Sequence, residues 1–180
     1  MIITLSGTPG SGKSSVAKAL AKKLGCKFYK AGELRRKYAS QHGLTLAELN
    51  KQAEKDPASD KLVDDYMKKM AKSEDNLIVD AVLGFHFFPN SIKIFLDADA
   101  KMRAKRIFER ENFEERPINI KEAFMLIEKR QTGDAARFEK LYGVNHLDPN
   151  HFDLTLDTTN NTVEQTVSLI YRFIMSRMKG

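Results

Sequence analysis

The residues best suited to chemistry lie near the start of the chain, in Gly7-Thr8-Pro9-Gly10-Ser11-Gly12-Lys13-Ser14. This segment matches G-x-x-x-x-G-K-[ST] at every fixed position. Its glycines let the backbone curl so that successive N–H groups point at a phosphate, and a following helix adds its positive N-terminal end. Lys13 can reach the β- and γ-phosphates, and the Ser14 hydroxyl can bind Mg²⁺. We therefore expect residues 7–15 to bind a nucleoside triphosphate.

Arginine is the second residue type whose spacing points to phosphate chemistry. Three groups occur: Arg35 and Arg36; Arg103, Arg106 and Arg110; and Arg130 and Arg137 with Asp134 between them. In the second and third groups, spacings of three and four place the side chains on one helix face. An acceptor that is already an anion needs cations more than a general base, because two polyanions must approach each other. We interpret the second and third groups as a closing lid rather than as solvated ion-pair ladders.

Alternating apolar runs and helical segments predict the framework that positions these residues. Strands are expected at residues 2–6, 27–30, 77–80, 92–97 and 154–157. Helices are expected from about residue 14, at 33–41, from 45 to before Pro57, at 60–72 and 100–111, from 119 to 141, and from 162 onward. This alternation predicts an α/β fold of three layers, a five-stranded parallel sheet with helices on both faces. Ligands of such sheets lie at the carboxyl ends of the strands, where the glycine loop and Asp80 both fall.

Bulk composition fits one domain. The chain has 180 residues, a net charge of +6 and one cysteine, Cys26. It contains no apolar run of membrane-spanning length, and its start lacks the features of a signal peptide. The basic balance suits polyanionic ligands, and the absence of a basic stripe with interleaved aromatic residues does not favour nucleic acid. We expect a cytoplasmic monomer that does not bind membranes.

The chain resembles the cytidylate kinases, nucleoside monophosphate kinases of the P-loop class, and in particular their archaeal type. The resemblance extends over nearly the whole chain. It rests on segment 43–50 with Asp56, Pro57 and Asp60, on 94–98, on the triplet Arg130, Asp134 and Arg137, and on 154–159 followed by 163–165.

The resemblance implies a reaction and a division of the chain. Such an enzyme transfers the γ-phosphate of ATP, with Mg²⁺, to CMP or dCMP and gives CDP or dCDP. The core would comprise residues 1–32, 76–100 and 151–180. A helical arm that binds the monophosphate would span about 33–72, and a short helical lid about 103–137.

The resemblance also implies residue roles. The catalytic residues would be Lys13, Arg106, Arg110, Arg130 and Arg137, with Arg106 and Arg110 folding over the transferring phosphoryl group. Substrate would be bound by Gly32, Arg36, Asp60, Asp80, Arg130, Asp134 and Arg137: Arg36 and Arg137 at the acceptor phosphate, Arg130 and Asp134 at phosphate and ribose. Asp80 would lie near Mg²⁺, through water, beside Ser14. Thr158 would lie near the adenine of ATP, together with residues 7–15 at its phosphates.

One departure concerns the base. Relatives often carry an Asp-Gly-Arg-like sequence after the third strand, whose arginine helps to read cytosine, whereas this chain has Asp80-Ala81-Val82-Leu83-Gly84. The base preference therefore stays open. The nearby aromatic residues Phe85, Phe87 and Phe88 are expected in the core rather than stacked on a base. His86, among them, is expected to be a surface or core histidine rather than a catalytic one. His42, His146 and His151 lack metal-ligand spacing and receive no role.

Several alternatives remain open. The acceptor could be another monophosphate, UMP or AMP, or another small molecule such as shikimate or dephospho-coenzyme A. The Arg130, Asp134, Arg137 spacing and the archaeal-type middle segment count against the latter. A P-loop ATPase or switch acting with RNA or a protein partner is a further alternative, kept open by the missing arginine. The choice between ATP and GTP and between ribose and deoxyribose is also open.

Overall fold

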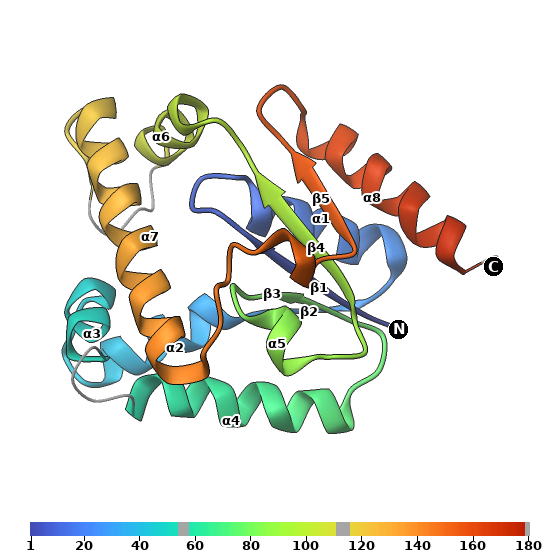
Figure 1. The fold of residues 1–180 in the computed structure, drawn as a ribbon, viewed down its shortest axis with the longest axis horizontal. Helices are drawn as coiled ribbons and strands as arrows, with labels where there is room; N and C mark the ends of the chain where they lie inside the picture. Colours follow the sequence, from blue (N-terminus) through green and yellow to red (C-terminus); the bar gives the residue numbers. More distant parts are fainter. Residues whose placement is uncertain (54–57, 111–115, 179–180) are drawn as a thin grey trace.

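A computed structural model describes residues 1–53, 58–110 and 116–178. In this part of the chain, five parallel strands form one sheet in the order β2-β3-β1-β4-β5 (Figure 1). The strands are β1 Ile2–Gly7, β2 Lys27–Lys30, β3 Leu77–Asp80, β4 Ile92–Asp97 and β5 Leu154–Asp157. Leu5 of β1 pairs with Asp80 on one side and with Ile94 on the other. The carboxyl ends of β1 and β3 therefore meet at one edge, next to the loop that follows β1.

Helices cover both faces of the sheet. On one face lie α1 (Lys13–Leu24) and α8 (Val163–Arg177); on the other lie α4 (Ala58–Ser73) and the single turn α5 (Gly84–Phe87). Each face has its own buried cluster. Ile3 and Leu5 of β1 pack with residues of α1 and α8, whereas Val79 of β3 packs with residues of α4 and α5. The layers are thus helix, sheet and helix.

The side chains of the central strand β1 alternate between the two faces of the sheet, and this alternation positions the segment that follows β3. Ile3 and Leu5 face α1 and α8, and Thr4 and Ser6 point to the opposite face, where both are fully buried. Ser6 Oγ donates hydrogen bonds to the carbonyl oxygens of Ala81 and Val82, at 3.2 and 2.9 Å. Buried hydroxyls need such partners. These bonds hold the segment after β3 at the end of β1.

The remaining helices flank the carboxyl end of the sheet. They are α2 (Ala31–Gln41), α3 (Leu46–Ala53), α6 (Ala100–Phe108), α7 (Ile120–Tyr142) and the 3₁₀ turn Pro149–His151. In Figure 1, α6 lies toward the top of this end, α2, α3 and α4 lie toward the bottom, and α7 runs from α6 down to α2. A small separate cluster packs α6 against α7, formed by Ala104, Ile107, Ala123 and Ile127. The capping boxes expected at Thr45 and Thr162 are present at α3 and α8. At α7, Asn119 Oδ1 accepts from the Glu122 N–H as expected, but the Glu122 carboxylate accepts from the N–H of Ile118 and not from that of Asn119.

The predicted α/β fold class is confirmed, with changes at element ends. Strand β1 extends to Gly7, α2 begins at Ala31, and α6 ends at Phe108 rather than at residue 111. Residues 54–57 and 111–115 lie outside the described residues, and with them Asp56, Pro57 and Glu111. The turn α5 and the turn Pro149–His151 were not expected, because hydrophobic periodicity cannot reveal a helix of one turn.

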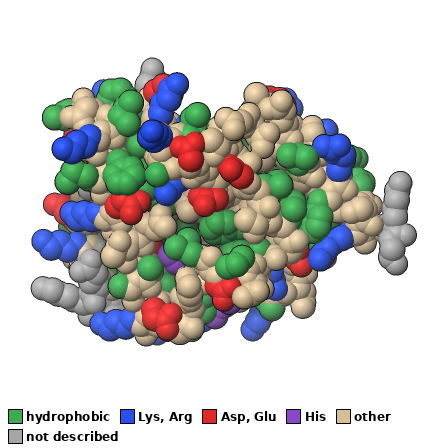
Figure 2. Space-filling model, turned by 45° about the horizontal axis from the view of Figure 1, so that its top comes forward, with side chains coloured by type: hydrophobic (Ala, Val, Ile, Leu, Met, Phe, Trp, Pro, Cys, Tyr) green, Lys and Arg blue, Asp and Glu red, His purple; other side chains and the backbone are tan. Residues whose placement is uncertain are grey.

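The outer surface mixes both signs of charge. On the face drawn in Figure 2, Lys and Arg side chains alternate with Asp and Glu rather than forming one broad basic patch. Among the described residues, no helix combines the length and the apolar character needed to cross a membrane.

Candidate active site

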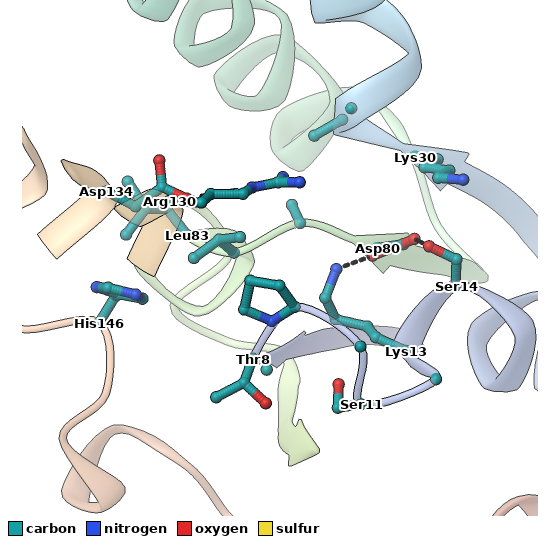
Figure 3. A pocket seen from close by; sticks show the side chains of 18 of the residues that line it. Thr8, Ser11, Lys13, Ser14, Lys30, Asp80, Leu83, Arg130, Asp134 and His146 are labelled. Carbon is teal, nitrogen blue, oxygen red and sulfur yellow. Dashed lines mark hydrogen bonds and ion pairs between the residues drawn. The ribbon is translucent and has the colours of Figure 1, made fainter. Parts of the chain in front are cut away.

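A cavity of about 640 Å³ lies at the carboxyl end of the sheet, where residues of α2, α3, α4, α6 and α7 line it. All the residues that the sequence assigned to the site line it, from the loop at residues 7–15 to Arg137 and Thr158. Figure 3 shows Lys13, Ser14 and Asp80 on one side, and Arg130, Asp134 and His146 on the other. We call these the donor end and the acceptor end. Their placement agrees with the predicted roles, and the roles themselves stay predictions.

The loop of the donor end has its shape imposed by two neighbours. Gly7 has φ +151°, and a Cβ there would overlap the carbonyl oxygen of Leu96 in β4. Gly10 has φ +85°, and its Cβ would come within 2.7 Å of the carbonyl oxygen of Arg103 in α6. Both positions therefore require glycine. The loop is tied down further by Thr8, whose Oγ1 donates to Asp97 Oδ1 at 2.6 Å.

Lys13 and Ser14 meet Asp80 at the end of β3. Lys13 Nζ forms a short ion pair with Asp80 Oδ1, and Ser14 Oγ donates to Oδ2 at 2.5 Å. Burial would raise the pKa of Asp80, which is 2% exposed, but the charge of Lys13 and the two hydrogen bonds outweigh it and lower the pKa. The carboxylate is therefore ionised at neutral pH.

These groups also fit a magnesium ion. Mg²⁺ prefers hard oxygen ligands and is bound through one or two carboxylates together with phosphate oxygens. The Ser14 hydroxyl and the ionised Asp80 carboxylate supply such oxygens beside the loop. Among the described residues, no group of three or more His, Cys, Asp or Glu side chains could hold a metal alone. Nucleotide phosphate oxygens would supply further ligands to such an ion.

Arg106 lies over the outer side of the loop. Its guanidinium donates to the carbonyl oxygen of Thr158 at 2.7 Å, to Thr158 Oγ1 at 3.1 Å and to the Gly10 carbonyl oxygen at 3.4 Å. Thr158 Oγ1 in turn donates to the Ser11 carbonyl oxygen at 2.8 Å. Arg106 therefore bridges α6, the loop and the segment after β5, on the side predicted to hold adenine.

Three further cations converge between the two ends. Lys30, at the end of β2, lines the cavity with Arg36 and Arg110. Burial lowers the pKa of Lys30, and the positive charges of Arg36 and Arg110 lower it further. The negative charge of Asp80 acts in the opposite direction. The space that Gly32 leaves is used by Arg36, whose Nη1 lies 3.5 Å from where a Cβ of Gly32 would stand. Such a concentration of positive charge is suited to a phosphate.

An ion-pair ladder joins three helices at the acceptor end. Asp60 of α4 pairs with Arg35 of α2, and also with Arg137 of α7, at 3.6 Å between Oδ2 and Nε. Arg137 Nη2 donates to Asp134 at 2.7 Å, and Arg130 Nε lies 3.8 Å from Asp134. Only Arg130, with its side chain 43% exposed, reaches well into solvent. The ladder thus holds the arm helices against α7.

Beyond the ladder, three polar side chains lie among apolar ones. Tyr142 Oη donates to Asp64 Oδ2 at 2.8 Å, and Asp64 is 9% exposed. Burial raises the pKa of Asp64, although the hydrogen bond from Tyr142 and the charge of Lys68 oppose this. His146 is 5% exposed, and its ring meets the ring of Phe138 edge-on at 5.2 Å. Its pKa is lowered, chiefly by burial, so the imidazole is neutral.

Some expectations need correction. Arg103 does not join Arg106 and Arg110 at the cavity: it is buried, donates to Gln131 at 3.0 Å and lies near Asp97, so it ties α6 to its neighbours. His146, given no role by the sequence, lines the cavity. Lys30, Asp64 and Tyr142 were also missed. For Asp64 and Tyr142 a signal was available, because residues four apart lie on the same face of a helix. Asp64 lies four residues after Asp60, and Tyr142 lies four after Phe138 and eight after Asp134.

The position expected for the aromatic residues after β3 is confirmed. Phe85, Phe87 and Phe88 are buried in the cluster between sheet and α4, as expected. His42 stacks on Tyr38 and His151 stacks on Phe85, both away from the residues that line the cavity.

Comparisons with known proteins agree with this geometry. Residues 3–125 match the protein family described as "AAA domain". The chain is 36% identical to the cytidylate kinase of Methanocella arvoryzae, with 97% of each chain covered. It is 40% identical to that of Sulfolobus acidocaldarius, over 94% of this chain and 92% of the relative. The shikimate kinase of Bacteroides thetaiotaomicron has the same fold, with a TM-score of 0.69, 15% identity, and coverage of 97% of this chain and 98% of that one.

The two kinds of similarity support different conclusions. At 15% identity, the similarity to the shikimate kinase supports only a shared fold, because proteins with one fold catalyse many different reactions. The cytidylate kinases match along almost the whole chain, through both ends of the cavity. The chain therefore belongs to the cytidylate kinase family.

Proposed function

We propose that this protein transfers the γ-phosphate of ATP to CMP or dCMP. The observation that carries the proposal is a single cavity with a phosphate loop at one end and a cation-lined acceptor end at the other. Phosphoryl transfer depends mainly on positioning and charge neutralisation, and this cavity offers both. Family membership supplies the choice of acceptor.

At the donor end, the backbone N–H groups of residues 7–15 would hold the nucleotide phosphates, as in other phosphate loops. Lys13 would leave Asp80 for the β- and γ-phosphates. Ser14 and Asp80 would hold Mg²⁺, which neutralises phosphate charge when bound. Thr158 would border the adenine, beside the Arg106 guanidinium.

At the acceptor end, Arg36 and Arg137 would bind the monophosphate, with Lys30 close by. Arg130 and Asp134 would orient its phosphate and ribose. Because the ladder already fixes Arg137 between two carboxylates, this cation is preorganised, and little reorganisation is needed when the anion arrives. An oxygen of the acceptor phosphate then displaces ADP in line.

Closure of the two helical groups would complete the site. We infer that the arm at about 33–72 and the lid at about 103–137 move relative to the core formed by 1–32, 76–100 and 151–180. The small cluster between α6 and α7, separate from the two sheet clusters, supports movement of these helices as a unit. Closure would carry Arg110 over the transferring group and exclude water that competes for it.

We further propose a monomer that works in the cytoplasm. Cys26 is a free thiol, as is usual in a reducing compartment.

The test is ADP production from ATP and Mg²⁺ with each of CMP, dCMP, UMP, AMP, GMP and dTMP. We expect the rate to be highest with CMP or dCMP. A preference for another monophosphate would keep the mechanism and change the substrate. Hydrolysis that no acceptor stimulates would overturn the proposal and favour the ATPase or switch.

A further inference from the structure

The wall of the cavity that follows β3 carries no polar side chain able to read a base. Ala81, Val82 and Leu83 line it, where relatives often place an arginine. Figure 3 shows Leu83 between the loop and the acceptor end. Base recognition in this chain must therefore come from another wall.

The wall formed by α7 changes character along the helix. Asp134, Phe138 and Tyr142 follow one another at intervals of four and line the cavity. The helical rise places Tyr142 about 12 Å along the axis from Asp134, the length scale of a nucleoside monophosphate. The wall is charged where the acceptor phosphate and ribose are proposed to bind, and it becomes apolar and aromatic toward Tyr142. A base would lie at this second part.

Apolar side chains there can pack on the faces of a base. Met67 of α4, Leu83, Phe138 and Leu147 all line this part of the cavity. Three polar side chains interrupt them: Asp64, Tyr142 and His146.

The carboxylate of Asp64 is oriented and keeps acceptor capacity. Tyr142 Oη donates one hydrogen bond to Asp64 Oδ2. An ionised carboxylate has about four lone-pair sites on its two oxygens and can accept further hydrogen bonds. Among the described residues, none forms a hydrogen bond with Nδ1 of the buried His146. A buried polar atom without a partner costs stability, which is consistent with a partner supplied by a ligand.

We propose that Asp64 reads the base by accepting a hydrogen bond from the exocyclic amino group of cytosine, with Tyr142 positioning the carboxylate and His146 contributing a second polar contact. The proposal rests on the function proposed above and names the groups that select the base. Aspartate is suited to this amino group. Uracil presents a carbonyl oxygen instead, and two acceptors facing each other in a buried site leave both unpaired.

The decisive variant is Asp64→Asn, which keeps the shape and the acceptor of the Tyr142 hydrogen bond while adding a donor. The measurement is kcat/KM for CMP and for UMP. We expect the CMP-to-UMP ratio to fall about 10- to 100-fold, the worth of one hydrogen bond to a charged group. The matched control is Asp65→Asn on the exposed side of α4, which should leave the ratio unchanged.

Tyr142→Phe gives a second, independent reading if Asp64→Asn is poorly folded. It keeps the ring and removes only the hydroxyl that orients Asp64. We expect a higher KM for CMP with the KM for ATP unchanged, a split that a general loss of structure would not produce. Thermal unfolding of each variant, followed with and without ATP, checks that the donor end is intact.

The outcomes separate this inference from the proposed function. Wild-type protein that does not phosphorylate CMP contradicts the function. Wild-type protein that prefers CMP, with folded Asp64→Asn and Tyr142→Phe variants showing an unchanged CMP-to-UMP ratio and CMP KM, contradicts the role of Asp64 alone.

Discussion

The donor and acceptor ends of the cavity are both proposed to bind a phosphate, and they are built by different means. The donor end uses one continuous segment, residues 7–15, and mainly its backbone N–H groups. The acceptor end uses side chains from α2, α4 and α7, which are far apart in sequence and meet through Asp60. A local motif therefore builds one end, and tertiary packing builds the other.

The two ends also differ in what keeps them in shape. Gly7 and Gly10 are pressed against the backbone of β4 and α6, so the loop cannot relax. The acceptor end depends on charges: removing one member of the ladder would leave a buried partner uncompensated, which is strongly destabilising. Mutations at the donor end should thus act on turnover, and those at the acceptor end on both binding and stability.

The largest effect is expected from Lys13→Ala. The loss of its charge from the transferring phosphates should lower kcat about 10³-fold, by analogy with other preorganised transition-state groups. Steady-state ADP formation with CMP measures this. Lys13→Arg, which keeps the pair with Asp80, separates the catalytic loss from a loss of stability. Near-normal turnover of Lys13→Ala would contradict the donor end as described.

A smaller effect, at the other end, is expected from Arg137→Lys. An ammonium cannot match the guanidinium contacts with both Asp134 and Asp60, so the acceptor phosphate loses a fixed partner. We expect the KM for CMP to rise about 10- to 100-fold, the worth of one charge-assisted hydrogen bond, with the KM for ATP unchanged. Arg172→Lys, on the exposed side of α8, is the control. An equal change in both KM values would argue against a separate acceptor end.

The smallest effect is expected from Gly133→Ala, in the α7 segment that carries the ladder. Its Cβ would meet nothing within 4 Å, and alanine favours helix, so the free energy of unfolding should rise by about 0.5–1 kcal/mol. Urea unfolding measures this. The same change at Gly10 should destabilise the protein and weaken ATP binding, because of its positive φ and the nearby Arg103 carbonyl. An equal change in the free energy of unfolding for Gly133→Ala and Gly10→Ala would contradict the view that only the donor loop is sterically confined.

Features that depend on neighbouring residues in the chain can be predicted from the sequence. The five strands, the long helices and the phosphate loop follow from periodicity, caps and one motif. Lys30 and His146 were missed because each reaches the cavity through the packing of separate elements. Asp64 and Tyr142 follow predicted site residues at helical spacings of four and eight, but only the packed structure shows that these faces line the cavity. Arg103 was misjudged for the same reason: helical spacing places it on the face of Arg106, but Gln131 of α7 provides its hydrogen bond.

The strand order has a consequence for synthesis on the ribosome. The central strand β1 is made first, but its partners β3 and β4 end only at Asp80 and Asp97. At about 5–20 residues per second, on the order of ten seconds pass before both partners exist. Until β3 is complete, the nascent chain carries an apolar strand with two unpaired edges, and until β4 is complete one of these edges stays open; an open apolar edge is prone to aggregate. Chains that terminate before Asp97 should therefore need chaperone shielding, whereas the finished chain can close its sheet at once.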